Sequence, residues 1–481
     1  MNVVFVAASS SYVHTLLAPR YLAVNSPVPV EIFETNVNID AKKNAEIICK
    51  KNPDILAFSC YIFNISYIKE LIDEIRKTLP SVTVIFGGYE ASFHEKELLP
   101  YYDYLLKGEG DISFGELLQK LENGASDIPK VIESGALKDL DSLKSPYTDD
   151  YLCFSKQNKI VYMETCRGCP FSCAYCMSAN THGVRSFSME RVFFDFDKIL
   201  SFSPPLVKLV DRTFNYDMRR AAKILSFLID KYGSSGTRFH FEMAPELFSE
   251  ELLSVIERAP KGLFQFEIGV QSYNEKTLAA VNRPARIDVV DASLSRLLSF
   301  GNVPIHVDLI AGLPYEDKGS FVCGFERLLS LRPDCLQLGF LKLLEGSKLA
   351  ERKDEYVTEK KPPYEVLRSP YMSEEDFAEL KKAEWALNVF YNSDRFHSSI
   401  RFLLDRVESA YETFLALEKA FSLSGFERKN LSSSRQCDLL FDYGKTVLSE
   451  QDLTIFENLI YEDFIAAGNV RKWHKWIKKG K

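Results

Sequence analysis

A group of cysteines in the middle of the chain could hold a metal centre. Cys169, Cys173 and Cys176 form a CxxxCxxC pattern in one short segment, which follows a predicted strand at Ile160–Thr165. Three thiolates at this spacing can bind one face of a cubane iron–sulfur cluster and leave the fourth iron open for another ligand. Soft sulfur ligands favour zinc and iron–sulfur centres over hard cations. The pattern therefore predicts a [4Fe–4S] cluster on these three cysteines.

Zinc is the competing interpretation of this segment. Structural zinc sites usually have four ligands in paired CxxC spacing, which the CxxxCxxC pattern does not match. Cys166 could be a fourth ligand, but it falls at the end of the predicted strand, where a small packed residue is the expected role. The chain has ten cysteines in 481 residues. A chain of this length needs no disulfide scaffold, so free thiols in the reducing cytoplasm are expected.

The elements that position the cysteines alternate between strand-like and helix-like patterns. Such alternation from about 159 to 345 indicates a partial (β/α)6 barrel, in which the chemistry sits at the C-terminal ends of the strands. The candidate strands are Ile160–Thr165, Leu206–Asp211, Arg238–Glu242, Leu263–Gly269, Val303–Ile310 and Cys335–Phe340.

The cysteine segment resembles the signature of the radical SAM superfamily, including the aromatic Tyr175 just before the last cysteine. The resemblance implies that the three cysteines bind a [4Fe–4S] cluster, and that its open iron binds the amino and carboxylate groups of S-adenosylmethionine (SAM). An electron passed through the cluster then cleaves SAM into methionine and a 5′-deoxyadenosyl radical. The superfamily's partial barrel also agrees with the six strand-helix units.

Later strand ends resemble the barrel of oxygen-independent coproporphyrinogen III oxidase and its relatives. By that resemblance, Glu242, Gln271, Arg283 and Asp308 contact SAM. The residue types suit this role, because carboxylates accept hydrogen bonds from ammonium and hydroxyl groups and an arginine pairs with a carboxylate. Asp211 ends the second strand, where many members of the superfamily carry a glycine-rich motif for the SAM amino group. This chain has no glycine there, so the role of Asp211 stays open.

The first 130 residues predict a separate α/β domain. Short buried runs alternate with helical patterns such as Ile65–Leu79, which indicates a doubly wound, flavodoxin-like parallel sheet. Such sheets bind ligands at the carboxyl ends of their strands. A polar linker is expected at 131–158. The candidate strands are Val3–Ala7, Val30–Phe33, Asp54–Ser59, Thr83–Phe86 and Tyr104–Lys107.

Residues at the ends of three of these strands, most of them glycines, could form a cradle for a large ligand. They are Ser59, Gly87, Gly88, Gly108 and Glu109. Glycines in such positions let a planar or phosphate-bearing ligand approach the backbone, and a flavin or nucleotide site would look similar. Placed before a radical SAM barrel, the domain resembles the cobalamin-binding domain of the B12-dependent radical SAM class. The resemblance implies that these residues line the cobalamin site.

His14 is a candidate axial ligand of cobalt. Members of the B12-binding family that ligate cobalt through histidine carry an Asp-x-His-x-x-Gly motif after the first strand. Here Tyr12, His14 and Leu17 occupy the three motif positions, so the aspartate and the glycine are missing. A ligating imidazole usually needs an acceptor on its other nitrogen. A packing histidine is therefore the favoured interpretation.

The resemblance covers roughly residues 1–345 and is closest to uncharacterised proteins that add a C-terminal domain of unknown function. Residues 346–481 indicate a mainly helical domain, with helices expected at Ser373–Tyr391 and Ser398–Ser422. The class implies methyl transfer from methylcobalamin to an unactivated centre, with an external electron donor of the flavodoxin or ferredoxin type. The substrate, a small molecule or a peptide, is not specified by the sequence, nor is any catalytic acid or base.

Three other functions remain open. The first is a radical SAM oxidase, cyclase or rearrangement enzyme that does not use methylcobalamin. The second is a methylthiotransferase, but that class should carry three more cysteines in its N-terminal domain, where only Cys49 and Cys60 are found. The third is a non-catalytic cobalamin or redox sensor.

Bulk composition disfavours some partners. The net charge of -8 opposes a nucleic-acid backbone, although the final residues, Arg471–Lys481, are basic and are expected to form a solvated helix. No apolar run approaches the roughly 20 residues of a membrane span. The first residues, from Met1 to Val6, resemble a strand and not a signal peptide.

Overall fold

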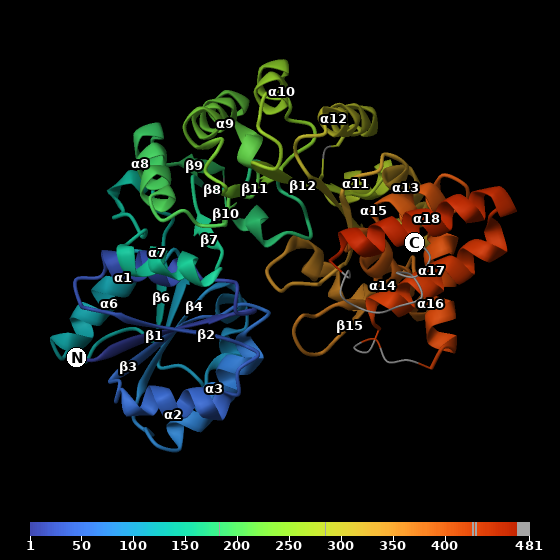
Figure 1. The fold of residues 1–481 in the computed structure, drawn as a ribbon. Coiled ribbons are helices and arrows are strands. Elements are labelled where there is room, and N and C mark those ends of the chain that lie inside the picture. The colour runs from blue at the N-terminus through green and yellow to red at the C-terminus, as the bar shows by residue number, and fades with distance from the viewer. Residues whose placement is uncertain (182, 284, 426–427, 429–430, 469–481) are drawn as a thin grey trace. The chain divides into compact units, whose positions relative to one another are not determined.

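The computed structural model describes residues 1–181, 183–283, 285–425, 428 and 431–468 (Figure 1). The basic segment Arg471–Lys481 lies outside these residues. The chain divides into two compact units, the first comprising 1–265, 342–351 and 359–365, and the second comprising 266–341, 352–358 and 366–481. Parallel sheets and a mainly helical C-terminal region confirm the predicted α/β class.

The first unit begins with a doubly wound sheet in the order β2-β1-β3-β4-β5-β6, and every pairing in it is parallel. The order of its first five strands is that of flavodoxin-like folds. All five predicted strands are present, and a sixth lies in the expected linker. The strands are β1 (Val3–Ser9), β2 (Glu31–Asn36), β3 (Ile55–Ser59), β4 (Thr83–Gly87), β5 (Tyr104–Gly108) and β6 (Val131–Ser134).

Helices cover both faces of this sheet because its strands are apolar on both sides. Residues of α2 and α3 pack on one face, and residues of α1 and α6 pack on the other (Figure 1). The side chain of Asp40 caps α2 by accepting a hydrogen bond from the Lys43 amide. The helices are α1 (Ala18–Asn25), α2 (Ala41–Lys50), α3 (Ile65–Arg76), α4 (Tyr89–Phe93), α5 (Glu95–Leu98), α6 (Ser113–Glu122) and α7 (Asp149–Cys153).

The barrel strands follow, and all six predicted strands are present. In the first unit, β7 (Val161–Met163), β10 (Leu206–Leu209) and β11 (Arg238–Met243) pair in parallel with β10 in the middle. An antiparallel ribbon of β8 (Cys166–Gly168) and β9 (Val184–Ser186) flanks the cysteine loop. The helices of this part are α8 (Met189–Leu200), α9 (Met218–Tyr232) and α10 (Glu250–Glu257).

In the second unit, β13 pairs in parallel with β12 and β14, and residues along β12 and β13 alternate between buried and half-buried. This alternation matches strands that present successive side chains to opposite faces. The strands are β12 (Phe264–Gln271), β13 (Ile305–Ala311) and β14 (Cys335–Phe340), and the helices are α11 (Glu275–Ala280), α12 (Ile287–Phe300) and α13 (Lys318–Ser330).

The C-terminal part of the second unit is mainly helical, as predicted. Ser373 and Asp376 form a capping box that starts α14 (Glu374–Leu387), which continues as a π-helical turn to Asn392. The Asn392 side chain hydrogen bonds to both the backbone N–H and the backbone C=O of Leu336 on β14. The other elements are α15 (His397–Leu404), α16 (Ala410–Leu423), α17 (Ser433–Val447) and α18 (Glu450–Ala466), and the short strands β15 (Val357–Thr358) and β16 (Val366–Arg368).

Candidate cofactor sites

A cavity of about 1030 Å³ opens at the carboxyl ends of the N-terminal sheet in the first unit. Its volume is at the upper end of the roughly 300–1,000 Å³ of ordinary small-molecule sites, as a ligand as large as a corrinoid requires. Residues flanking the cysteine loop also line it, among them Cys166 and Gly168. All five predicted cobalamin residues line this one cavity: Ser59, Gly87, Gly88, Gly108 and Glu109.

Two glycines of the cradle are required by close backbone packing. Gly88 has φ +93°, and a Cβ at this position would lie 2.6 Å from the carbonyl oxygen of Cys60. Gly108 has φ +87°, and a Cβ there would lie 2.1 Å from the carbonyl oxygen of Ser134. Both backbone conformations favour glycine. The ends of β4 and β5 therefore present bare backbone to the cavity.

His14 also lines the cavity, and its Nδ1 lies 2.6 Å from the hydroxyl of Tyr162 on β7. Burial, followed by the charge of Lys208, lowers the pKa of His14. The neighbouring Thr15 hydroxyl donates to the carbonyl of Ile160 at 3.0 Å. The Tyr162 hydroxyl is therefore hydrogen bonded to Nδ1 of His14, in a chain that lacks the aspartate of the Asp-x-His-x-x-Gly motif. Sequence patterns gave no indication of Tyr162, which is 148 residues away.

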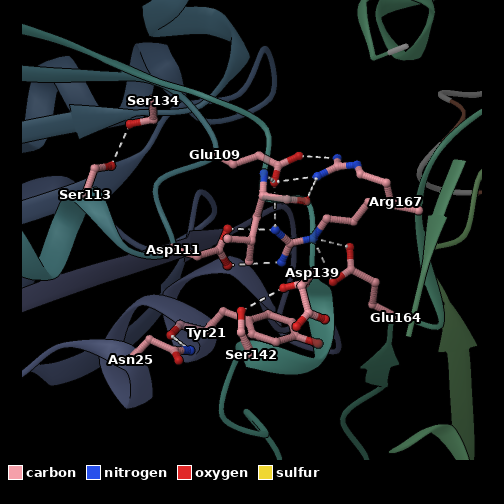
Figure 2. A network of polar contacts seen from close by, with 12 residues as sticks. Tyr21, Asn25, Glu109, Asp111, Ser113, Ser134, Asp139, Ser142, Glu164 and Arg167 are labelled. Atoms are coloured by element: carbon pink, nitrogen blue, oxygen red, sulfur yellow. Dashed lines mark hydrogen bonds and ion pairs between the residues drawn. The ribbon is translucent and has the colours of Figure 1, made fainter. Parts of the chain in front are cut away.

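An ion network joins the end of β5 to the cysteine loop (Figure 2). The Arg167 guanidinium pairs with both carboxylate oxygens of Asp111, at 2.7 and 3.0 Å, and its Nε lies 3.0 Å from Glu164. Glu109 lies 3.4 Å from Arg167 and also pairs with Arg185. The carboxylate of Glu109 is therefore engaged by two arginines, and the residue also lines the cavity. The spacing of Glu164 and Arg167 could have indicated the local pair, but not the partners after β5.

The charges of this network are partly buried, and the pKa values of its carboxyl groups are shifted. Burial raises the pKa of Glu164 to about 7, although Arg167 acts in the opposite direction. The pKa of Glu109 is lowered, because hydrogen bonds from Arg185 and from the Leu137 amide outweigh the effect of burial. Partly buried ion pairs are screened by salt much less than exposed pairs.

The three predicted cluster ligands lie in the turn after β8. Cys173 is buried, Cys169 and Cys176 are half-buried, and the Cys176 amide donates to the Cys173 carbonyl at 3.0 Å. The Cys169 sulfur lies 3.4 Å from the Thr213 hydroxyl. Within the described part of the chain, no three His, Cys, Asp or Glu side chains form a site for one metal ion. A cubane places each thiolate on a different iron, so its ligands need not converge on one point.

Cys166 and Asp211 have structural surroundings. Asp211 is fully buried, and its carboxylate accepts hydrogen bonds from the amides of Thr165, at 2.8 Å, and Cys166, at 3.2 Å, and from the Thr165 hydroxyl. Burial and the nearby Asp211 charge raise the pKa of the Cys166 thiol far above its ordinary value. A thiol held in its neutral form is a poor metal ligand, which fits the packing role expected for Cys166.

Three of the four predicted SAM residues gather around Gly269 in the second unit. The Arg283 guanidinium donates to the Gly269 carbonyl at 2.5 Å, and Asp308 is the register partner of Gly269 on β13. Gln271 has φ +72°, and a Cβ on Gly269 would lie 2.0 Å from its amide nitrogen. Glycine at 269 therefore makes room for Gln271. Glu242, the fourth residue, lies half-buried on β11 in the first unit.

Glu316, which follows β13, is a functional candidate that the sequence did not single out. It is 1% exposed, and one carboxyl oxygen accepts a hydrogen bond from the Ser272 hydroxyl at 2.6 Å. The other oxygen has no hydrogen-bond partner among the described residues. Burial raises the pKa of Glu316 from 4.5 to about 7.

We expect Glu316 to make the protein less stable as the pH rises. Between pH 4.5 and 7 the folded protein keeps a proton on Glu316 that the unfolded chain releases, so the free energy of unfolding falls across this window, by up to about 3 kcal/mol. Glu316→Gln should flatten that part of the profile, measured by urea unfolding at a series of pH values. The same substitution at the exposed Glu375 is the control, and equal slopes in the two variants would refute the assignment.

Three family models match successive parts of the chain. The model of the B12 binding domain matches residues 10–118, and that of the radical SAM superfamily matches residues 163–322. The model that matches residues 353–481 is that of DUF4080, a protein of unknown function.

The chain therefore combines a B12-binding domain with a radical SAM domain. The predicted cofactors are thereby confirmed for these domains: cobalamin for the first, and a [4Fe–4S] cluster with SAM for the second. Which side chain contacts which cofactor stays a prediction.

A curated relative of this B12-binding radical SAM protein is the cobalamin-dependent radical SAM methyltransferase TokK from Streptomyces tokunonensis. The two are 26% identical over 309 residues, which cover 58% of this chain and 45% of TokK. The chain thus spans about half the length of the curated relatives it matches.

Two solved structures share the fold of this B12-binding radical SAM protein. The radical SAM methyltransferase TsrM from Kitasatospora setae, with cobalamin and a [4Fe–4S] cluster bound, superposes with a TM-score of 0.63 at 14% identity. That match covers 93% of this chain and all of TsrM. The cobalamin-dependent radical enzyme OxsB matches with a TM-score of 0.62 at 15% identity, over 98% of this chain and 84% of OxsB. Among the helices that the structure describes, none is both long and apolar enough to cross a membrane.

Proposed function

We propose that this protein is a cobalamin-dependent radical SAM enzyme that transfers a methyl group to an unactivated centre of its substrate. The observation that carries the proposal is the cavity of the first unit. Its walls come both from the strand ends of the B12-binding domain and from residues that flank the cysteine loop, such as Cys166 and Gly168. The TokK and TsrM relatives, both named as methyltransferases, favour methyl transfer over other radical reactions.

The donor sets fit the implied cofactors. Cys169, Cys173 and Cys176 would hold the cluster, because three soft ligands in one turn leave an iron corner open. The backbone at Gly88 and Gly108 would border the corrin, because both glycines line the cavity and neither carries a side chain. When bound, these cofactors supply reductive cleavage of SAM to a 5′-deoxyadenosyl radical and a methyl group for transfer.

The chain's own residues position and shield these groups. Asp211 fixes the backbone that enters the cysteine loop, and Thr213 lies against the Cys169 sulfur. Glu242, Gln271, Arg283 and Asp308 would bind the amino acid and ribose parts of SAM, since charged and amide groups match their hydrogen-bonding needs.

Methylthiotransferase activity is disfavoured by the cysteines of the N-terminal domain. Cys49 lies on α2, and Cys60 is fully buried with a strongly raised pKa, mainly because of burial. Two such thiols do not provide the second three-cysteine set of that class.

The deciding experiment is anaerobic purification, followed by absorbance spectroscopy and incubation with SAM and dithionite. We expect the absorption of an iron–sulfur cluster together with corrin bands, and release of 5′-deoxyadenosine. Cluster and corrin without 5′-deoxyadenosine would favour a sensor. 5′-Deoxyadenosine without corrin would favour an oxidase, cyclase or rearrangement enzyme. Either result would refute the proposal.

The proposed chemistry also requires a partner and a compartment. One electron must reach the cluster for each SAM cleaved, so we include an external donor of the flavodoxin or ferredoxin type. The substrate is proposed only as a small molecule or a peptide. We place the protein in the cytoplasm, because a reducing compartment keeps cysteine thiols available to bind a cluster.

Gly88→Ala should weaken cobalamin binding and lower stability. The new Cβ would lie 2.6 Å from the Cys60 carbonyl, in an extended backbone conformation with positive φ that costs an L-residue roughly 1–3 kcal/mol. Gly124→Ala is the matched control, because Gly124 also has positive φ but nothing lies near its Cβ position. Equilibrium dialysis with hydroxocobalamin and thermal unfolding measure both effects. Equal behaviour of the two variants would contradict the cradle.

A further inference from the structure

The loops proposed to serve two different cofactors meet in one ion network. The β5 loop, from Gly108 to Asp111, borders the cobalamin cavity, and Arg167 lies two residues before Cys169. Arg167 contacts Asp111 with two nitrogens, and both residues belong to the first unit (Figure 2). A bidentate pair of this kind fixes orientation as well as distance.

The ribbon that carries Arg167 depends on these carboxylates. Arg167 and Arg185 are direct register partners on β8 and β9. Like charges directly opposite each other on an antiparallel pair repel. Glu109 pairs with both arginines. The carboxylates after β5 therefore stabilise a ribbon that would otherwise be destabilised by its own charges.

The connection from Arg167 to the first cluster cysteine is short and tightly packed. Gly168 has φ +96°, and a Cβ there would lie 2.1 Å from the carbonyl oxygen of Gly183. The Gly168 backbone is thus in close contact with the opposite side of the ribbon. A displacement of Arg167 would be passed to Cys169 instead of being absorbed between them.

The contacts between Arg167 and Asp111 are largely shielded from solvent. The side chains of Arg167 and Asp111 are 13% and 9% exposed, so bulk solvent screens their attraction weakly. Removing one partner of such a pair leaves the other charge buried and uncompensated. Any ligand that shifts the β5 loop therefore acts on Arg167.

We propose that the Arg167–Asp111 pair couples the two cofactor sites, so that occupancy of the cobalamin cavity and loading of the cluster favour each other. Arg167 acts as a positioning residue between the two sites, and it lines the cobalamin cavity together with Asp111. By linkage, the factor by which the cluster tightens cobalamin binding equals the factor by which cobalamin tightens retention of the cluster. The proposal rests on the proposed function, because it needs both sites.

The test compares hydroxocobalamin affinity in full-length protein with and without the reconstituted cluster, by anaerobic equilibrium dialysis. In the wild-type protein we expect the cluster to tighten binding by roughly 5- to 150-fold, the usual range of coupling between two sites. Arg167→Lys keeps the charge but loses the two-nitrogen fork, and Asp111→Asn keeps the size but loses the charge. In both variants, the ratio of hydroxocobalamin affinity with the cluster to that without it should lie within about two-fold of one.

Asp149→Asn removes the exposed partner of Lys198 in the same unit and should keep the wild-type ratio. Loss of iron to a chelator, with and without hydroxocobalamin, gives the reciprocal readout, which a purely structural role would not change in parallel. A wild-type ratio of one, or a wild-type ratio retained in both variants, would overturn the coupling alone. Absence of cobalamin binding in every form would overturn the proposed function as well.

Discussion

Replacing Cys169, Cys173 and Cys176 by serine is expected to abolish the formation of 5′-deoxyadenosine. A serine hydroxyl is a much harder ligand than a thiolate and does not replace it on iron. The loss should exceed the roughly 10- to 100-fold that follows removal of a residue that only supports a metal ligand through a hydrogen bond. The measurement is 5′-deoxyadenosine released with SAM and dithionite, together with iron bound per chain after anaerobic reconstitution.

Cys166→Ser provides the control within the same segment. Cys166 is buried, its thiol is held neutral, and its amide is bound by Asp211. This variant should keep the iron content and the spectrum of the wild-type protein. Loss of the cluster in Cys166→Ser, or its retention in the triple variant, would reassign the ligands.

Asp211→Ala is expected to destabilise the protein even when no metal is present. The change removes three hydrogen bonds and leaves the buried amides of Thr165 and Cys166 without their acceptor. Each unsatisfied buried donor costs about 1–3 kcal/mol. We therefore expect the free energy of unfolding of the cluster-free protein to fall by about 3 kcal/mol or more, measured by urea denaturation.

Two comparisons separate this structural role from contact with SAM. Asp217→Ala removes the exposed N-cap of α9, which should cost only about 1 kcal/mol. Asp211→Asn retains the volume and one acceptor, so its loss should be intermediate. If Asp211→Ala weakened SAM binding but left the unfolding free energy unchanged, Asp211 would be a ligand contact and not an anchor.

The parallel strands could be predicted because their burial is recorded in local sequence. β3 is apolar at four of its five residues and is buried throughout, as a strand covered on both faces must be. The edge strand β6 escaped prediction for the converse reason. Its residues are half-buried or exposed and include Glu133, so Val131–Ser134 resembled part of a polar linker.

The helix expected over Ser398–Ser422 is divided in two. Ser409 is the local N-cap of the second helix, because its hydroxyl accepts a hydrogen bond from the Glu412 amide, and a residue outside this segment adds further contacts. α16 begins after Ser409, where the Glu326 carboxylate accepts hydrogen bonds from the Ser409 hydroxyl and from the amides of Ala410 and Tyr411. Glu326 lies on α13, far away in the chain. The periodicity of apolar residues continues across the break and does not reveal the hydrogen bonds that Glu326 adds from another helix.

The residues of the candidate sites also include some that could be predicted from the sequence and some that could not. The cysteine pattern and the residues after the strands could be found because their spacing is local. The partners that hold them could not. Tyr162 reaches His14, and Asp111 reaches Arg167, only because the fold brings distant segments together.

The contact of Asn392 with β14 lets the C-terminal residues cover part of the edge of the barrel sheet. β14 ends its sheet, and an uncovered strand edge is a template for pairing with another molecule. The amide of Asn392 imitates a neighbouring strand by satisfying both backbone groups of Leu336. A chain cut after the barrel would expose this edge and tend to self-associate. We therefore expect the region of unknown function to protect the barrel sheet from aggregation at this edge.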